Sequence, residues 1–136
     1  AGEPLTSTTV MSATEYLRAQ QTRDGGFPYQ SGTPGGADVN STALVVQALT
    51  ALRSDPDGLG WTTRLTATAA ITLTAHTPVD WLLGQQSTSG AFVAFGGDSD
   101  FATLQAIPAL LDRPFPIVTR RVYLPLLQRQ TILRER

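Results

Sequence analysis

The chain has 136 residues, of which 41% are hydrophobic, a formal net charge of -1 at pH 7 and no cysteine. This length suffices for one modest domain with a single core. The near-neutral charge offers no electrostatic basis for binding nucleic acid or an anionic membrane, and no apolar run is long enough to span a bilayer. The absence of cysteine excludes a disulfide framework and a thiolate metal site.

A helix–turn–helix pattern in residues 12–52 returns in a shorter form in residues 77–111. Internal similarity over tens of residues indicates stacked helical hairpins, because a single hairpin cannot bury its apolar face alone. We therefore predict a mainly α fold with a repeat domain over residues 1–112, in which the two segments are unit one and unit two. Residues 113–136 depart from the repeat and form a C-terminal arm.

Two offsets relate the units. Subtracting Gly25 from Gly90 gives 65, an offset that holds from the first helix through the glycine-rich turn. Subtracting Asp38 from Asp98 gives 60 for the second helix. The difference between 65 and 60 predicts that the second unit is five residues shorter than the first.

The first helix of each unit is predicted to begin at a capping box, Ser12–Glu15 in unit one and Thr77–Asp80 in unit two. In such a box a hydroxyl accepts a hydrogen bond from the amide three residues on, and the carboxylate reaches back to the cap amide. Pro78 suits the first helical position, where its missing donor would be unpaired anyway. Both helices are expected to run to paired glutamines, at residues 20–21 and 85–86, where glycines that tolerate positive φ stop them.

The second helix of unit one is predicted to begin near Asp38 or Asn40, since either side chain can cap it. In the run of residues 43–52 only one glutamine and one threonine interrupt the apolar residues, which predicts a helix buried on most sides. The pattern indicates outer amphipathic helices that alternate with inner buried ones.

The equivalent helix of unit two is predicted to begin near Asp100. Phe101, Leu104 and Leu111 share one face of this helix at helical spacing. Pro108 falls inside the helix and is expected to kink it, because proline removes one backbone hydrogen bond and crowds the preceding turn.

The segments outside the helices have their own patterns. Residues 24–37 are rich in glycine and are predicted to form an irregular loop that can shape a pocket rim, and residues 55–58, Asp-Pro-Asp-Gly, are predicted to form a turn. In the connector, residues 62–76, apolar residues alternate with threonines, and this period of two favours extended structure. The arm, residues 113–136, is too apolar to stay solvated without cost, so it packs either on its own domain or on a missing part or second copy.

The turn of each unit holds a glutamine, a glycine and an aromatic residue at the same spacing, Gln21-x-x-x-Gly25-x-Phe27 and its copy in residues 86–92. This pattern resembles the repeat of squalene and oxidosqualene cyclases. QQTRDGGF followed by ADVNSTALVVQALTAL resembles the wider α/α-toroid superfamily of terpenoid cyclases, protein prenyltransferase β-subunits, cobalamin carriers and bacterial cell-surface proteins without assigned activity. The resemblance covers roughly residues 12–111 and implies a partial α/α-toroid. In it the glutamine and the aromatic residue tie one helix end to the next.

The number of hairpins bears on the partners of the chain. A closed ring of this superfamily needs about six helix hairpins, whereas this chain offers two. A two-hairpin array exposes inner apolar faces at both ends, so we expect missing repeats of a longer chain, or a second copy through self-association, to cover them. The resemblance to surface proteins implies an extracellular or cell-surface location.

Class II terpenoid cyclases protonate an alkene with an aspartic acid held in a short acid-rich run, and the nearest match here is residues 98–101, Asp-Ser-Asp-Phe. Two close carboxylates can raise one another's pKa and supply a general acid. Because Asp98 and Asp100 fall where Asp38 and Asn40 fall in unit one, helix capping is the preferred interpretation of both.

No metal site or cofactor is predicted. The zinc site of prenyltransferase β-subunits uses aspartate, cysteine and histidine, and this chain has only His76 and no cysteine. His76 is therefore interpreted as a surface or capping residue. Asp55 and Asp57, like the two aspartates near residue 99, supply oxygen atoms without the spacing of a known calcium loop.

Two functions remain open. The first is a non-catalytic binding or scaffold module that takes a small apolar ligand in a shallow groove, with Tyr29, Trp81 and Phe95 as candidate ligand-binding residues. The second is a fragment of an isoprenoid-processing enzyme with Asp98 or Asp100 as general acid. Core packing is the preferred interpretation of the aromatic residues at repeat-equivalent places: Tyr16, Trp81, Phe27 and Phe92.

Overall fold

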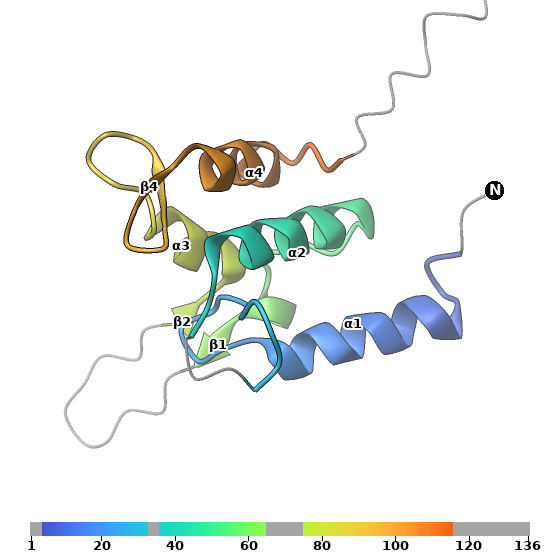
Figure 1. Ribbon diagram of the computed structural model, residues 1–136. Helices are drawn as coiled ribbons and strands as arrows, with labels where there is room; N and C mark the ends of the chain where they lie inside the picture. The colour runs from blue at the N-terminus through green and yellow to red at the C-terminus, as the bar shows by residue number, and fades with distance from the viewer. Residues whose placement is uncertain (1–3, 33–35, 65–74, 116–136) are drawn as a thin grey trace, which may run out of the picture.

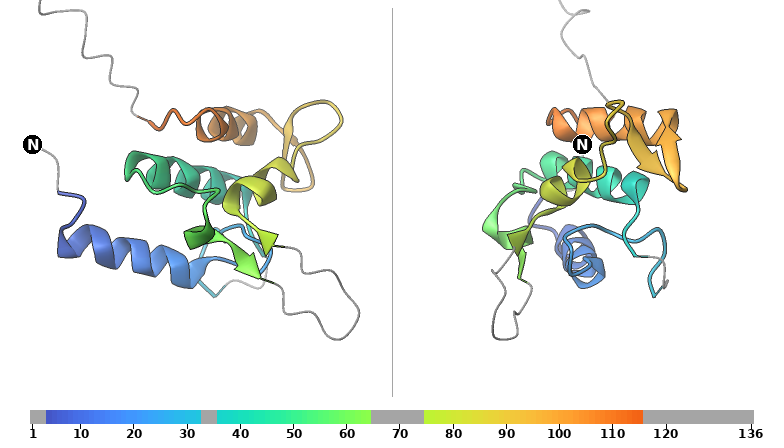
Figure 2. Two further views of the ribbon diagram at one scale, coloured as in Figure 1. Left: turned by 180° about the vertical axis from the view of Figure 1, so that it is seen from behind. Right: turned by 90° about the vertical axis from the view of Figure 1, so that its left-hand side faces the viewer.

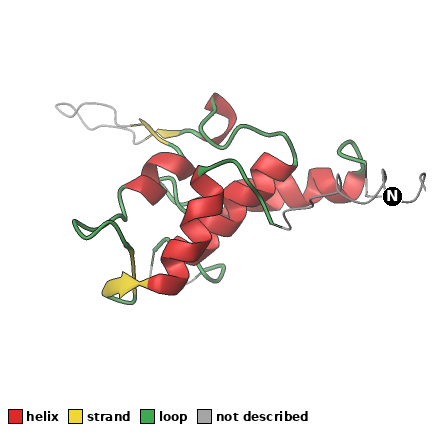
Figure 3. Cartoon of the chain, turned by 90° about the horizontal axis from the view of Figure 1, so that it is seen from above, coloured by secondary structure: helices red, strands yellow, loops and turns green. Residues whose placement is uncertain are grey.

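The computed structural model describes residues 4–32, 36–64 and 75–115. Within them the chain is mainly α, as predicted (Figure 3). The elements in order are α1 (Thr8–Gln20), α2 (Val39–Ala51), the 3-10 turn η1 (Leu59–Trp61), β1 (Thr63–Arg64), β2 (Ala75–His76), α3 (Pro78–Leu83), β3 (Phe92–Ala94), β4 (Gly97–Ser99) and α4 (Asp100–Leu110). The four strands form two separate antiparallel pairs, β1 with β2 and β3 with β4.

The three longer helices lie in successive layers, with α2 between α1 and α4 (Figures 1 and 2). Helix α2 runs opposite to α1 and in the same direction as α4 (Figure 1). The contact between α2 and α4 is the most extensive between any two elements. As a result, the N-terminal ends of α2 and α4 lie at the same end of the molecule.

The core consists of two clusters of buried side chains. The larger joins α2, α3, β3 and α4, and α4 contributes small residues to it: Val39, Ala43, Val46, Leu82, Phe92, Ala102, Ala106 and Ala109. The smaller cluster contains Phe27, Leu49 and Trp61, with Leu17 and Val45 packed against it. Helix α1 has no buried residue of its own.

The predicted start of the first helix at Ser12 is wrong. Helix α1 begins five residues earlier than that cap requires, because the Ser7 hydroxyl accepts a hydrogen bond from the Val10 amide at 3.3 Å and caps Thr8–Gln20. Nothing between Ser7 and Ser12 breaks a helix, so the helix extends back to the cap at Ser7. The capping box at Thr77–Asp80 is confirmed, with Pro78 at the start of α3.

The predicted cap is confirmed for the second helix of unit one and is wrong for that of unit two. Asp38 caps α2, as predicted, by accepting from the Ser41 amide at 2.8 Å. Helix α4 is capped by Ser99, and neither Asp98 nor Asp100 has the capping role that the sequence suggested.

This choice of cap changes the alignment of the two units. Subtracting the α2 cap from the α4 cap, 99 minus 38, gives 61 rather than 60. The same value relates two threonines: the Thr42 hydroxyl accepts from the Phe27 amide at 2.9 Å, and the Thr103 hydroxyl accepts from the Phe92 amide at 2.9 Å. The predicted offset was therefore wrong by one residue, because it matched acid with acid rather than cap with cap.

The glycine turns agree with their predicted equivalence. The Gln21 side chain donates to the Gly25 carbonyl at 3.0 Å, and Gln86 donates to the Gly90 carbonyl at 2.9 Å. Both glycines have positive φ, 97° and 90° respectively. Helix α1 reaches its paired glutamines, whereas α3 ends earlier, at Leu83.

Helix α4 presents large apolar side chains to solvent. The exposed fractions of three residues predicted to share one face, Phe101, Leu104 and Leu111, lie between 62% and 65%. Helix α2, in contrast, is buried on most sides, as predicted. The expectation that both second helices are inner and buried is therefore wrong for this surface of α4. Pro108 is buried and lies in the last turn of the helix.

The remaining predicted segments are described in part. The 55–58 turn is confirmed by a hydrogen bond of 3.1 Å from the Gly58 amide to the Asp55 carbonyl. The ends of the connector are extended, since β1 pairs with β2, and its residues 65–74 lie outside the described part, as do residues 116–136 of the arm. In the described residues, no helix combines the length and apolar character that crossing a membrane requires.

Candidate functional site

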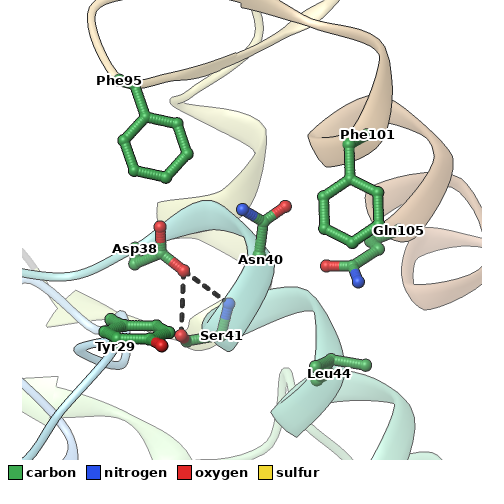
Figure 4. Close-up of a pocket in the computed structure, with 8 residues that line it drawn as sticks. All are labelled: Tyr29, Asp38, Asn40, Ser41, Leu44, Phe95, Phe101 and Gln105. Atoms are coloured by element: carbon green, nitrogen blue, oxygen red, sulfur yellow. Dashed lines mark hydrogen bonds between the residues drawn. The ribbon is translucent and has the colours of Figure 1, made fainter.

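A pocket of about 680 Å³ lies where the N-terminal ends of α2 and α4 meet the loop after Phe27 and the β3–β4 hairpin (Figure 4). We call it the α2–α4 pocket. Its volume falls within the range of small-molecule sites, about 300–1,000 Å³. Its lining residues are Tyr29, Asp38, Asn40, Ser41, Leu44, Phe95, Phe101 and Gln105.

The two repeat units contribute equivalent positions to the pocket. With the offset of 61, Asn40 corresponds to Phe101 and Leu44 corresponds to Gln105. Within each helix the two positions are four residues apart, so Asn40 and Leu44 lie on one face of α2, and Phe101 and Gln105 lie on one face of α4. The pocket therefore forms because α2 and α4 run in the same direction and present equivalent positions of their first two turns to one space.

The Asp38 side chain caps α2 and also lines the pocket. One carboxylate oxygen accepts from the backbone amide and from the hydroxyl of Ser41, each at 2.8 Å. Its other oxygen points toward Phe95 in the close-up (Figure 4). The cap fixes the side chain in place and leaves one anionic oxygen directed at the pocket.

Two amide oxygens of the lining have no hydrogen-bond partner among the residues that the structure describes. They are Asn40 Oδ1 and Gln105 Oε1, and both atoms are buried. In Figure 4 each points into the gap between α2 and α4. A buried acceptor without a donor costs about 1–3 kcal/mol, so these two oxygens are a cost of packing α2 beside α4.

Phe95 forms the rim of the pocket in an unusual conformation. It occupies the two-residue tip of the β3–β4 hairpin together with Gly96, and both have positive φ, 54° and 87°. This is the backbone of a type I′ turn, which favours Asn or Gly at the first position. A bulky residue there costs about 1–3 kcal/mol. The ring is 98% exposed, so nothing in the described residues compensates this strain.

Of the predicted ligand-binding residues, the structure brings Tyr29 and Phe95 into the pocket and leaves Trp81 out. The Trp81 ring packs against Gly26, and its Nε1 donates to Asp24 Oδ2 at 3.0 Å. Trp81 therefore fastens the first glycine turn to α3 and has a structural function.

The predicted core packing of the other aromatic residues is confirmed in part. Phe27 and Phe92 are buried. Tyr16 is exposed, because α1 buries no residue, so core packing was the wrong expectation for Tyr16.

The two candidate catalytic acids lie outside the pocket lining. Asp98 is exposed and accepts a hydrogen bond from the Ser89 hydroxyl. That bond, with a contribution from Ser87, holds the pKa of Asp98 below its ordinary value. A general acid for an alkene needs a carboxyl whose pKa is raised, so the shift has the wrong direction. Asp100 is the exposed first residue of α4.

The described residues contain no cluster of three or more His, Asp or Glu side chains that could hold a metal ion. His76 lies in β2, half-buried, and its carbonyl accepts from the Thr63 hydroxyl at 3.0 Å. Asp55 shapes its own turn, and Asp57 accepts from the Thr77 hydroxyl at 2.6 Å, which ties that turn to the start of α3. These aspartates are thus used in local structure.

Sequence reasoning missed six lining residues as binding residues. Asp38 and Asn40 were considered only as caps, Phe101 only as part of an apolar helix face, and Ser41, Leu44 and Gln105 had no assigned function. The signal that identifies most of them is the repeat itself, once the caps are aligned. With an offset of 61, the first turns of both second helices fall in register, and their i and i+4 positions face one space.

No family model, no curated protein and no solved structure matches the chain.

Proposed function

We propose that this chain is a non-catalytic binding or scaffold module of α/α-toroid type. The observation that carries the proposal is the α2–α4 pocket, to which both repeat units contribute equivalent positions from the first two turns of their second helices. A pocket at the junction of two repeats, lined mainly by aromatic and apolar side chains with a few polar groups, is typical of a site that binds a small ligand.

The polar groups of the pocket support binding rather than catalysis. The lining holds no histidine, lysine or cysteine, and its one carboxylate is engaged as the cap of α2. Its polar atoms can orient a ligand through hydrogen bonds, but the lining offers no activated nucleophile and no free acid–base pair. The enzyme alternative, with Asp98 or Asp100 as general acid, has no supporting geometry at this site.

The outer face of α4 supports the scaffold part of the proposal. Four large apolar side chains of α4 and its C-cap are 46–65% exposed: Phe101, Leu104, Ile107 and Leu111. We propose that missing repeats of a longer chain, or a second copy, cover this surface, because contiguous exposed apolar residues mark interaction surfaces. On the resemblance to toroid surface proteins, we also propose an extracellular or cell-surface location.

A titration with the neutral apolar dye Nile red, run beside sedimentation velocity, tests the proposal. We expect dye binding that Phe101→Ala weakens, and concentration-dependent association that Leu104→Arg reduces. Leu59→Arg is the matched control, because Leu59 is 88% exposed on η1, outside α4, and should leave both readings unchanged. A chain that stays monomeric at every concentration and binds no dye would contradict the proposal.

A further inference from the structure

We propose that copies of this chain associate head to tail, with one side of α4 of one copy seated on one side of α2 of the next. The α4 side, which we call the α4 face, consists of Leu104, Ile107 and Leu111. The α2 side, which we call the α2 face, consists of Ser41, Val45 and Ala48. The inference rests on the scaffold part of the function proposed above and commits it to one partner, a second copy.

The α4 face is equivalent to the side of α2 that already packs on α4. Ala43 and Val46 of α2 are fully buried in the larger core cluster, to which α4 contributes its alanines. At the offset of 61 these two residues correspond to Leu104 and Ile107, which are 65% and 46% exposed. Two positions that face a neighbouring helix in unit one therefore face solvent in unit two, where they carry larger apolar side chains.

The α2 face is equivalent, in the same way, to the side of α4 that packs on α2. Three alanines of α4 are buried in the larger cluster: Ala102, Ala106 and Ala109. Subtracting 61 gives residues 41, 45 and 48, which form the α2 face. Here Ser41 and Val45 are half-buried and Ala48 is exposed. The chain thus leaves open a second copy of each side of the contact that α2 and α4 make with each other.

A groove beside the α2 face can receive the side chains of a docking helix. It measures about 220 Å³ and lies between α1 and α2. Its lining includes residues of both helices: Tyr16, Leu17, Gln20, Ser41, Leu44 and Val45. No lining residue is charged, so apolar side chains of α4 can enter the groove without burying an unpaired charge. The exposed ring of Tyr16, which the single chain leaves in solvent, lies in this groove.

Other occupants of the α4 face explain less of the surface. A symmetric pair of α4 helices would cover the α4 face and leave the α2 face open in both copies. Further repeats of a longer chain would follow the same equivalence, but this chain already holds both faces that the contact requires. An interface between two different faces is heterologous, and it either closes into a ring or continues from copy to copy.

Blocking one face at a time tests this arrangement. Leu104→Arg places a charge on the α4 face, and Ala48→Arg places one on the α2 face; both positions are exposed, so each variant should fold. We expect each variant alone to associate about tenfold more weakly than the wild type, because every contact then includes a blocked face. An equimolar mixture should form dimers and stop there, because only one pair of faces is intact. Sedimentation velocity measures all three samples, and Leu59→Arg should associate like the wild type.

The absence of cysteine permits a direct test of the same contact. Ile107→Cys and Ala48→Cys are chosen because their equivalents, Val46 and Ala109, share the larger cluster. We expect oxidation of a mixture of the two variants to give a disulfide-linked dimer in much higher yield than either variant alone. A mixture of Ala48→Cys with Leu59→Cys is the matched control and should give no such increase, since Leu59 is exposed on η1.

The results that overturn the inference are distinct from those that overturn the proposed function. Leu104 and Ala48 do not line the α2–α4 pocket, so Nile red binding by both arginine variants shows that they are folded. A wild type that associates while the mixture does not recover, or cross-linking of Ile107→Cys with itself alone, would refute the head-to-tail contact and leave the scaffold proposal intact. A wild type that stays monomeric at every concentration would refute the second copy as partner, and Nile red binding would then still support the binding function.

Discussion

The two glycine turns share one hydrogen-bond pattern and differ in what surrounds them. In each, a glutamine side chain and two backbone amides close the loop around a glycine with positive φ. The first turn, from Gln21, leads into three buried residues, Gly25 to Phe27, whereas the second, from Gln86, has no buried residue before Phe92. Equal local sequence thus gives equal local structure, but the neighbours decide how much each turn stabilises the fold.

The space around the glycines of the two turns shows how differently the turns are packed. A Cβ at Gly25 would lie 2.6 Å from the Thr77 carbonyl oxygen, and a Cβ at Gly26 would lie 2.6 Å from the Trp81 ring. A Cβ at Gly90 would meet nothing within 4 Å. The first turn is therefore packed against α3, and the second faces solvent.

The largest expected effect comes from replacing the two equivalent glycines. Gly25→Ala adds a clash with backbone to the strain of positive φ, so we expect a loss of about 3 kcal/mol or more in the free energy of unfolding. Gly90→Ala adds the strain alone, for a loss of about 1 kcal/mol. Urea denaturation of both variants measures the difference, and equal losses would show that the two turns are equally packed.

A smaller difference is expected between the two glutamines. Gln21 donates to the Gly25 carbonyl and to the Trp61 carbonyl at 2.8 Å, whereas Gln86 donates to Gly90 only and is exposed. We expect Gln21→Ala to cost about 2 kcal/mol, because two partly buried carbonyls lose their donor, and Gln86→Ala to cost about 0.5 kcal/mol. Thermal unfolding of the pair checks this order, and a larger loss for Gln86→Ala would reverse the comparison.

The smallest effect concerns pH and the exposed turn. Ser89 lowers the pKa of Asp98 from its ordinary value of 3.8. Since the folded pKa is the lower one, the bond stabilises the fold above pH 3.8, and this contribution is lost as the pH falls through the folded pKa. An NMR titration of the Asp98 carboxyl should show that Ser89→Ala moves its pKa up toward 3.8, and an unmoved value would disprove the assignment.

The features predicted correctly from the sequence are local ones. The box at Thr77, the cap at Asp38 and the glutamine–glycine turns each depend on residues within five positions of one another. The errors came where several residues offer the same chemistry. Ser7 and Ser12 are equally good caps, and Ser99 lies between two aspartates that resemble those of a cap.

The pocket was harder to predict because it depends on tertiary packing. Tyr29 and Phe95 were named as candidate ligand-binding residues, but Asn40, Leu44 and Gln105 become neighbours only when α2 lies beside α4. No local pattern indicates that pairing. Core packing, the preferred interpretation of Trp81, agrees with its place against the larger cluster, but its hydrogen-bond partner, Asp24, is 57 positions away in the chain and could not be predicted from a local pattern.

Helix α1 contributes no buried side chain, and this has a dynamic consequence. It is joined to the rest chiefly near its C-terminal end, where the Arg18 guanidinium lies 5.0 Å from the centre of the Trp61 ring and Gln21 donates to the Trp61 carbonyl. Releasing the N-terminal turns of α1 uncovers little apolar surface, so their amide hydrogens should exchange with solvent through small local openings, well before global unfolding. The amides of α2, in the middle layer, should be the last to exchange.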